Sequence, residues 1–196
     1  MTVEYSNRKD ERYTLYEGRT KTGKPKYFCS RKPSKSGIPV LAMPEGYEWR
    51  ENPSNGIVSV RRITKSGIMP PEKEILEAGI RTHAGLSAFV VDIDGENLIA
   101  YISDFKDDGY IAELSNRPRE SLAMRTAIDR LSKLANYSPM LRFTLEDTNK
   151  RLFSVERWCF RGAIDDWIFV DRPAPLAKQI KKYVRHLGQE SFFELI

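Results

Sequence analysis

The most apolar stretch of the chain, residues 87–105, reads SAFVVDIDGENLIAYISDF. Both halves are rich in β-branched and aromatic residues, which favour strands. Asp94-Gly95 at the centre favours a hairpin, because Gly accepts the positive φ that a tight two-residue turn requires. The segment therefore predicts two paired strands, residues 87–92 and 98–103, at the heart of a sheet.

Further hairpins and amphipathic helices are predicted on both sides of this segment. Asn55-Gly56 marks a second tight turn, and Leu141, Phe143 and Leu145 alternate with polar residues as in a half-buried strand. The other predicted strands are residues 12–17, 26–30, 47–51, 57–63, 110–114, 152–160 and 167–170. The predicted helices are residues 71–83, 118–137 and 173–187, the last with Asp171 as N-cap and Gly188 as C-terminal stop.

This pattern predicts an α+β fold, because the strands form antiparallel pairs and the helices are interspersed among them. A linker-like segment, residues 64–71, separates a small basic antiparallel β unit, residues 1–66, from an α+β core domain, residues 67–196. Apolar residues make up 40% of the chain and charged residues 30%, as in a soluble globular protein.

Composition also indicates a cytoplasmic protein. The N-terminus is polar and mixed in charge, unlike a secretory signal, and no stretch approaches the roughly 20 apolar residues that span a bilayer. Cys29 and Cys159 are too few for a disulfide framework and are expected to be reduced, buried thiols. Neither the spacing of His and Cys nor any nucleophile motif predicts a zinc site or a catalytic triad.

The formal charge of +5 is unevenly distributed. Seven basic residues and no acidic one lie between positions 19 and 35, whereas residues 87–120 contain eight acids and three bases. Such asymmetry indicates either a nucleic-acid surface at one end or attraction within an assembly. The candidate binding residues are Arg19, Lys21, Lys24, Lys26, Arg31 and Lys32.

Aromatic residues are interleaved with these cations. Rings that stack on bases, beside cations that neutralise phosphates, would suit single-stranded nucleic acid. The alternative is that many of the rings form the core of a small sheet and that the cations are only solvated. The rings concerned are Tyr13, Tyr16, Tyr27, Phe28, Tyr47 and Trp49.

Within the basic region, Gly18 to Lys24 nearly spells a phosphate-binding loop. Pro25 stands where that motif needs a Ser or Thr hydroxyl, and it has no N–H to offer a phosphate. A strand-like segment follows, whereas the motif requires a helix N-terminus. The segment therefore predicts the basic tip of a hairpin.

Asp92 and Asp94 offer a second kind of chemistry. The apolar strand leading into Asp92-x-Asp94-Gly95 resembles the first motif of the haloacid-dehalogenase phosphatases, in which the matching Asp92 would be nucleophile and Asp94 general acid beside magnesium. Here Glu96-Asn97 leads directly into another strand, a departure from that family. Two aspartates on one strand face, with Asp104 as third ligand, would better suit a two-metal phosphoryl or nucleotidyl site holding magnesium or manganese.

The C-terminal segment SFFELI is too apolar to be left in solvent, so it is expected to dock on the core. The alternative is contact with a protein partner or a second copy. This tail (KKYVRHLGQESFFEL), with TGKPKYF and PEGYEWRENPSNG, resembles a group of hypothetical bacterial proteins. The resemblance implies a bacterial source and a shared fold, and it assigns no catalytic residue.

The preferred hypothesis is a non-enzymatic binding or interaction protein with a basic N-terminal surface, for which nucleic acid is one candidate partner, and without a membrane partner. The rival hypothesis is a metal-dependent phosphoryl- or nucleotidyl-transfer enzyme that uses Asp92, Asp94 and Asp104. The alternative interpretation of Asp92 and Asp94 is a hairpin turn with solvated carboxylates and no catalytic role.

Overall fold

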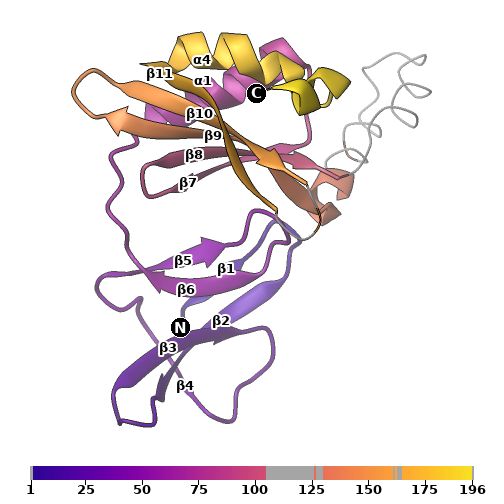
Figure 1. Cartoon of the computed structure of the whole chain (residues 1–196). Helices are drawn as coiled ribbons and strands as arrows, with labels where there is room; N and C mark the ends of the chain where they lie inside the picture. The colour runs from indigo at the N-terminus through magenta and orange to yellow at the C-terminus, as the bar shows by residue number, and fades with distance from the viewer. Residues whose placement is uncertain (1, 105–125, 127–129, 161, 163–164, 196) are drawn as a thin grey trace. The chain divides into compact units, whose positions relative to one another are not determined.

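The computed structural model describes residues 2–104, 126, 130–160, 162 and 165–195. It confirms an α+β fold built on antiparallel sheets (Figure 1). The chain divides into two compact units. Unit 1 comprises Met1–Ile63 and Leu122–Leu134, and unit 2 comprises Thr64–Ser121 and Ala135–Ile196. Each unit is described by itself below.

Unit 1 consists of a sheet and a separate hairpin. In the sheet, β2 pairs with β3 on one side and with β1 and β4 on the other, and all these pairs are antiparallel. In the hairpin, β5 and β6 form an antiparallel pair with Trp49 opposite Val60. The strands are β1 (Glu4–Ser6), β2 (Arg12–Arg19), β3 (Pro25–Ser30), β4 (Ile38–Pro39), β5 (Tyr47–Glu51) and β6 (Val58–Arg62).

One face of this sheet packs on the hairpin. Leu15 in β2 is fully buried and lies opposite Cys29 in β3. The Cys29 thiol donates a hydrogen bond to the Val58 carbonyl oxygen in β6 (3.0 Å). Burial raises the pKa of the Cys29 thiol, which keeps it protonated as a donor.

The backbone at Gly37, directly before β4, lies against two aromatic side chains of the sheet. A Cβ atom there would lie 2.7 Å from Phe28 Cζ and 2.9 Å from Tyr16 Cβ, closer than real Cβ contacts come. The Tyr16 and Phe28 rings stack with centroids 5.6 Å apart. The absence of a side chain at Gly37 therefore lets the backbone pass directly over these rings.

Unit 2 is organised on a five-stranded antiparallel meander in the order β11-β10-β9-β8-β7. Figure 1 shows α1 and α4 on one face of this sheet. The core between sheet and helices is continuous and includes the fully buried Leu98, Phe143 and Phe153. The strands are β7 (Phe89–Asp94), β8 (Asn97–Ser103), β9 (Tyr137–Asp147), β10 (Leu152–Cys159) and β11 (Asp166–Pro175).

The central hairpin is confirmed, with β7 reaching Asp94 and Gly95 adopting φ of 58° in the turn. The Asn97 amide donates to the Asp94 carbonyl oxygen (3.1 Å) across this turn. The alternation in β9 is also confirmed, because Leu141, Phe143 and Leu145 are buried while Arg142 and Thr144 lie on the other face, half-buried. Sequence alternation was sufficient here because one face of the sheet is covered.

Helix α1 (Pro70–Gly79) continues as a π-helical turn (Ile80–Ala84) and ends at Gly85, with φ of 68°. The second helix, α4 (Leu176–Tyr183), continues as a 3₁₀ turn (Val184–His186). Gly188 (φ of 78°) follows α4 as predicted. Positive φ suits glycine at a helix end, because no Cβ atom opposes it.

Two predicted boundaries were wrong. Asp171 is not the N-cap of α4, because β11 extends to Pro175 and the N-cap position is Pro175 itself. An edge strand tolerates Pro173 and Pro175, since their missing N–H groups need no neighbour.

The predicted helix over residues 118–137 does not reach its predicted end.

The described helical residues of that segment are 126 and 130–134. Tyr137 begins β9, where it pairs with Ser103 and is buried. Sheet pairing and burial therefore override helical periodicity at this position. The predicted strand at 110–114 lies outside the described residues.

The C-terminal tail docks on the core of unit 2, as predicted. It forms a 3₁₀ turn (Glu190–Glu194) in which Phe192 is fully buried and Phe193 is 59% exposed. Arg157, buried in β10, donates to the carbonyl oxygens of Leu195 and Phe193. Both apolar burial and hydrogen bonds to the backbone therefore hold the tail.

Gly79 in α1 packs directly against α4. A Cβ atom at this position would lie 2.3 Å from Ile180 Cγ2, and Ile180 is itself buried. We expect Gly79→Leu to lower the free energy of unfolding by about 3 kcal/mol through overpacking. Ala78→Leu, on the neighbouring exposed position, is expected to change it by less than about 0.5 kcal/mol. Urea denaturation of both variants tests this, and equal stabilities would contradict it.

Candidate functional site

The predicted basic residues lie on the β2–β3 hairpin and on the segment directly after it. Arg19 ends β2, Lys21 and Lys24 lie in the turn, and Lys26 belongs to β3. Arg31 and Lys32 follow the end of β3, and all six side chains are exposed. The hairpin therefore presents its cations to solvent.

The turn at residues 20–24 uses its own backbone groups internally. Gly23 N donates to the Thr20 carbonyl oxygen (2.9 Å), and Thr20 N donates to the Lys24 carbonyl oxygen (2.9 Å). Pro25 already belongs to β3, opposite Arg19. The segment is thus a hairpin tip followed by a strand, as predicted, without the loop-to-helix geometry of a nucleotide-binding loop.

Carboxylates compensate only part of this charge. Arg31 forms an ion pair with Glu11, whose pKa is lowered mainly by the hydrogen bond from Asn7 and further by Arg31. Within the ranges described, Lys21, Lys24, Lys26 and Lys32 take part in no ion pair. No acid occurs between Glu17 and Glu45. The hairpin therefore keeps an excess of positive charge.

Four of the predicted stacking rings are engaged within unit 1. Tyr13 and Tyr16 are buried and belong to its core. Phe28 stacks on Tyr16 beneath Gly37, and Trp49 packs on Tyr5 with ring centroids 5.5 Å apart. These rings stabilise the unit, as the alternative interpretation anticipated.

Tyr27 and Tyr47 form a more accessible ring pair. Both side chains are half-buried, and their centroids lie 5.0 Å apart in an edge-to-face arrangement. Arg62 Cζ lies 5.8 Å from the centroid of the Tyr47 ring. Tyr27 directly follows Lys26 in β3. The ring pair and the Arg62 cation therefore lie near the β2–β3 turn, on the face of β3 opposite the Lys26 side chain.

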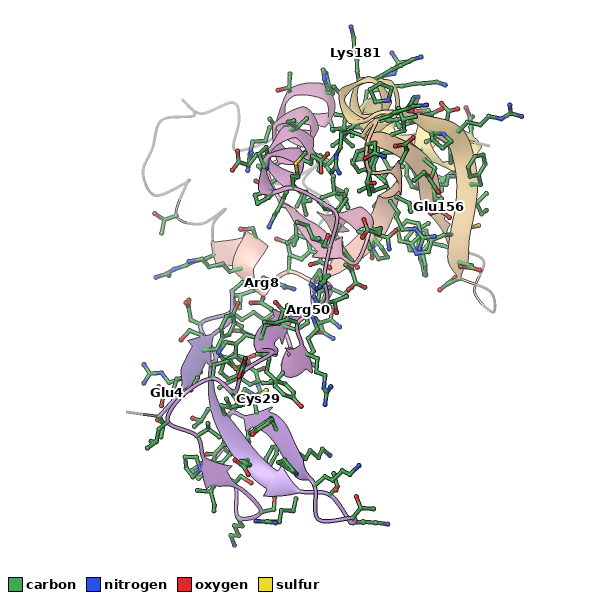
Figure 2. All side chains as sticks on the ribbon, turned by 90° about the vertical axis from the view of Figure 1, so that its left-hand side faces the viewer. Glu4, Arg8, Cys29, Arg50, Glu156 and Lys181 are labelled. Carbon is green, nitrogen blue, oxygen red and sulfur yellow. The ribbon has the colours of Figure 1, made fainter. Side chains whose placement is uncertain are left out.

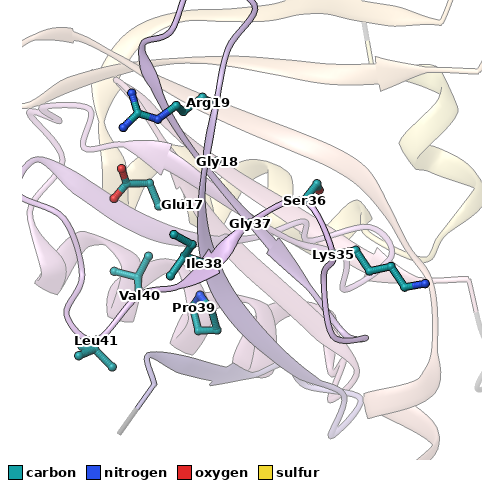
Figure 3. A pocket seen from close by; sticks show the side chains of 10 residues that line it. All are labelled: Glu17, Gly18, Arg19, Lys35, Ser36, Gly37, Ile38, Pro39, Val40 and Leu41. Atoms are coloured by element: carbon teal, nitrogen blue, oxygen red, sulfur yellow. The ribbon is translucent and has the colours of Figure 1, made fainter.

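An open hollow of about 750 Å³ lies beside the hairpin (Figure 3). Two cations, Arg19 and Lys35, and one carboxylate, Glu17, line it with the exposed Ile38 and Leu41. Lys35 is a basic residue that the predicted site omitted. The same acid-free run that indicated the other cations also contains Lys35.

The predicted metal ligands are distributed along the β7–β8 hairpin. Asp92 and Asp94 alternate with Val91 and Ile93, which belong to the core or pack on it, so both aspartates lie on the opposite face of β7. Asp94 pairs with Asn97, whereas Asp104 follows the far end of β8. Asp104 is seven residue steps from Asn97 along the strand, at about 3.3 Å for each step.

Asp104 is therefore not brought to the Asp92–Asp94 pair. Its carboxylate accepts a hydrogen bond from the Ser138 hydroxyl (2.5 Å). Among the residues that the structure describes, no group of three or more His, Cys, Asp or Glu side chains is arranged to hold a metal ion.

In the same part of the chain, no helix is long and apolar enough to cross a membrane.

Sequence reasoning missed a polar and aromatic cluster on the face of the unit 2 sheet opposite the core. Arg142 forms an ion pair with Glu156, and its guanidinium lies 4.5 Å from the Trp167 ring centroid. Trp158 meets Trp167 edge to face at 5.0 Å. Cross-strand pairing of β9, β10 and β11 creates this cluster, and no local motif indicates it.

Comparison with known proteins assigns no relative to this chain: no family model, curated protein or solved structure gives a match.

Proposed function

We propose that this protein is a non-enzymatic, nucleic-acid-binding protein whose unit 1 binds single strands with little sequence preference. The observation that supports this most is the exposed β2–β3 hairpin, whose three lysines, with Lys32 directly after β3, take part in no ion pair of the described chain. A polyanion is the partner class that such a surface attracts.

The cations would act as independent point charges. Lysine binds phosphate as a compact charge, and it reads no base sequence by this contact. The turn's backbone N–H groups at Thr20 and Gly23 are already hydrogen-bonded. The expected contribution is therefore electrostatic, and it weakens as salt rises because neutralised phosphates release their counterions.

The Tyr27–Tyr47 pair, together with Arg62, would add stacking. Bases in a single strand are free to stack on aromatic faces, at about 1–3 kcal/mol per base. Because the Tyr27 and Tyr47 side chains are half-buried, the rest of unit 1 holds these two rings in place. Stacking beside cations favours single strands over duplexes of equal length.

Charge removal tests the proposal. We expect Lys21→Gln, Lys24→Gln and Lys26→Gln together to weaken binding of a fluorescent 20-nucleotide strand about tenfold at low salt. The slope of log affinity against log salt should fall in magnitude by about 2, near 0.7 for each lost phosphate contact. Fluorescence anisotropy from 25 to 200 mM salt measures both quantities.

The matched control removes equal charge from unit 2, with Lys65, Lys73 and Lys150 changed to Gln. This control variant should retain the wild-type slope of log affinity against log salt. A wild-type protein that binds no single strand at 25 mM salt, or a hairpin variant indistinguishable from the control, would refute the proposal.

The metal-dependent phosphoryl- or nucleotidyl-transfer alternative has less support. It needs carboxylates that converge on one ion, and Asp104 is separated from Asp94 by the length of β8.

A further inference from the structure

Helix α4 and its 3₁₀ extension expose a second basic surface, in the other unit. Lys178, Lys181, Lys182 and Arg185 are all exposed. The adjacent Lys181 and Lys182 lie three and four residues after Lys178 and four and three residues before Arg185. Such spacing places them on one side of a helix. Figure 2 shows Lys181 projecting away from the ribbon. We call these four side chains the α4 basic face.

The opposite side of the same helix is buried. Its residues belong to the core of unit 2, so the apolar stripe is fully used in packing. The buried stripe comprises Leu176, Ile180, Tyr183, Val184 and Leu187. The α4 basic face is therefore the only side of α4 left for a partner.

Only one of the four cations is compensated within the described ranges. Lys182 Nζ lies 2.9 Å from Asp171 Oδ2, which also accepts a hydrogen bond from the Tyr183 hydroxyl (2.7 Å). These two hydrogen bonds, that of Tyr183 first, lower the pKa of Asp171. Lys178, Lys181 and Arg185 take part in none of the ion pairs there.

Neighbouring carboxylates do not supply the missing compensation. Glu77 on α1 is shared between Lys73 (3.9 Å) and Arg81 (3.5 Å) of its own helix. Between Asp171 and Glu190 the chain contains no acid. The α4 basic face therefore keeps a surplus of about three charges.

Stability of the helix does not account for this arrangement. Cations at spacings of three and four repel one another. The helix dipole favours Lys181 and Lys182 in the last turn, but it disfavours Lys178 in the first turn. Since the buried stripe alone would hold α4 on the core, uncharged polar residues would serve the fold equally well.

We infer that the α4 basic face binds the phosphate backbone of duplex nucleic acid, independently of unit 1. Residues 178 and 185 are seven positions apart, or about 10 Å along a helix. A duplex carries one charge per about 1.7 Å of its axis, so such a span meets several phosphates. Lysine and arginine on a convex helix suit that repeating polyanion.

An anionic membrane fits this surface less well. A helix that lies in a membrane interface inserts a bulky apolar side. The apolar stripe of α4 is already buried in unit 2, and Ala177 is the sole apolar residue among the exposed positions of α4. Charge attraction without insertion favours the nucleic acid.

The test uses the full chain with Lys178→Gln, Lys181→Gln and Arg185→Gln, which remove the charges and keep unbranched polar side chains of similar helix propensity. We expect about tenfold weaker binding of a 20-base-pair duplex at 25 mM salt. The slope of log affinity against log salt should fall in magnitude by roughly 2–3, near 0.9 for each lost phosphate contact. Circular dichroism should match wild type. The Lys65, Lys73 and Lys150 variant, with equal charge, should bind as wild type does.

Three results would overturn the inference: no duplex binding by wild type at low salt, an unchanged slope in the α4 variant, or tighter binding to phosphatidylserine vesicles than to duplex. The hairpin variant of unit 1 is measured separately against single strands. Failure of the α4 surface is therefore distinguishable from failure of the function proposed for unit 1.

Discussion

Phe192→Ala is expected to lower the free energy of unfolding of unit 2 by about 4 kcal/mol. Phe192 is fully buried in the main core although it lies near the chain end. Removing a buried Phe side chain loses its transfer free energy and leaves a cavity that the surroundings fill only partly. The 3₁₀ turn that contains Phe192 is also held by Arg157, so collapse of the tail into the cavity is restricted.

Phe193→Ala is the matched control, because the same side chain is removed one position away. Phe193 is 59% exposed and touches Phe192 edge to face, with centroids 5.4 Å apart. We expect Phe193→Ala to lower the free energy of unfolding by less than about 1 kcal/mol, because the side chain makes one aromatic contact and is little buried.

Both variants are best measured by urea denaturation followed by tryptophan fluorescence in a Trp49→Phe background. The remaining tryptophans, Trp158 and Trp167, then report on unit 2 alone. Equal losses for Phe192→Ala and Phe193→Ala would show that the tail is not part of the core.

Glu72→Ala should lower the free energy of unfolding of unit 2 by about 3 kcal/mol. The Glu72 carboxylate, 6% exposed, pairs with the Arg151 guanidinium and accepts a hydrogen bond from Met69 N (2.8 Å). Arg151 Nη2 also donates to the Gly67 carbonyl oxygen (3.1 Å). Removing one partner of a largely buried pair leaves the other charge without compensation.

This interaction joins the β9–β10 turn to α1 and to the segment directly before α1, about 80 residues earlier in the chain. Arg151 holds φ of 52° in that turn, an uncommon conformation for a residue other than glycine. Loss of Glu72 therefore removes a restraint on a strained backbone as well as an ion pair.

Glu74→Ala is the control on the same helix, since Glu74 is exposed, and it should change stability by less than about 0.5 kcal/mol. The same fluorescence measurement applies. If Glu72→Ala lowers the free energy of unfolding by less than about 1 kcal/mol, the Glu72–Arg151 pair does not stabilise unit 2 as we expect.

Local sequence predicted the hairpins best. Asp94-Gly95 and Asn55-Gly56 indicated two turns, and Gly95 and Gly56 both adopt positive φ. Alternation predicted the buried face of β9, because a strand with one covered face repeats every two residues. The six exposed cations of the β2–β3 region were likewise readable from the chain, since an acid-free run of that length leaves few partners nearby.

Predictions failed where distant pairing competes with local preference. Tyr137 continued a helical pattern, yet it pairs with Ser103 in the sheet. Asp171 had the composition of an N-cap, yet its carboxylate binds Lys182 and Tyr183 from within a strand. Neither competing partner is visible in a local window of the sequence.

The amino-acid sequence by itself determined the α+β class, the turns and the excess of positive charge near the N-terminus, because each depends on residues close together in the chain. Only the tertiary structure decided which aromatic rings are core and which remain accessible, that Asp104 is separated from Asp94, and that Glu72 meets Arg151. It also decided that the four cations of α4 share one exposed face, because that depends on which side of the helix the core buries. Contacts between segments that are distant in sequence are properties of the packed chain, so no local pattern encodes them alone.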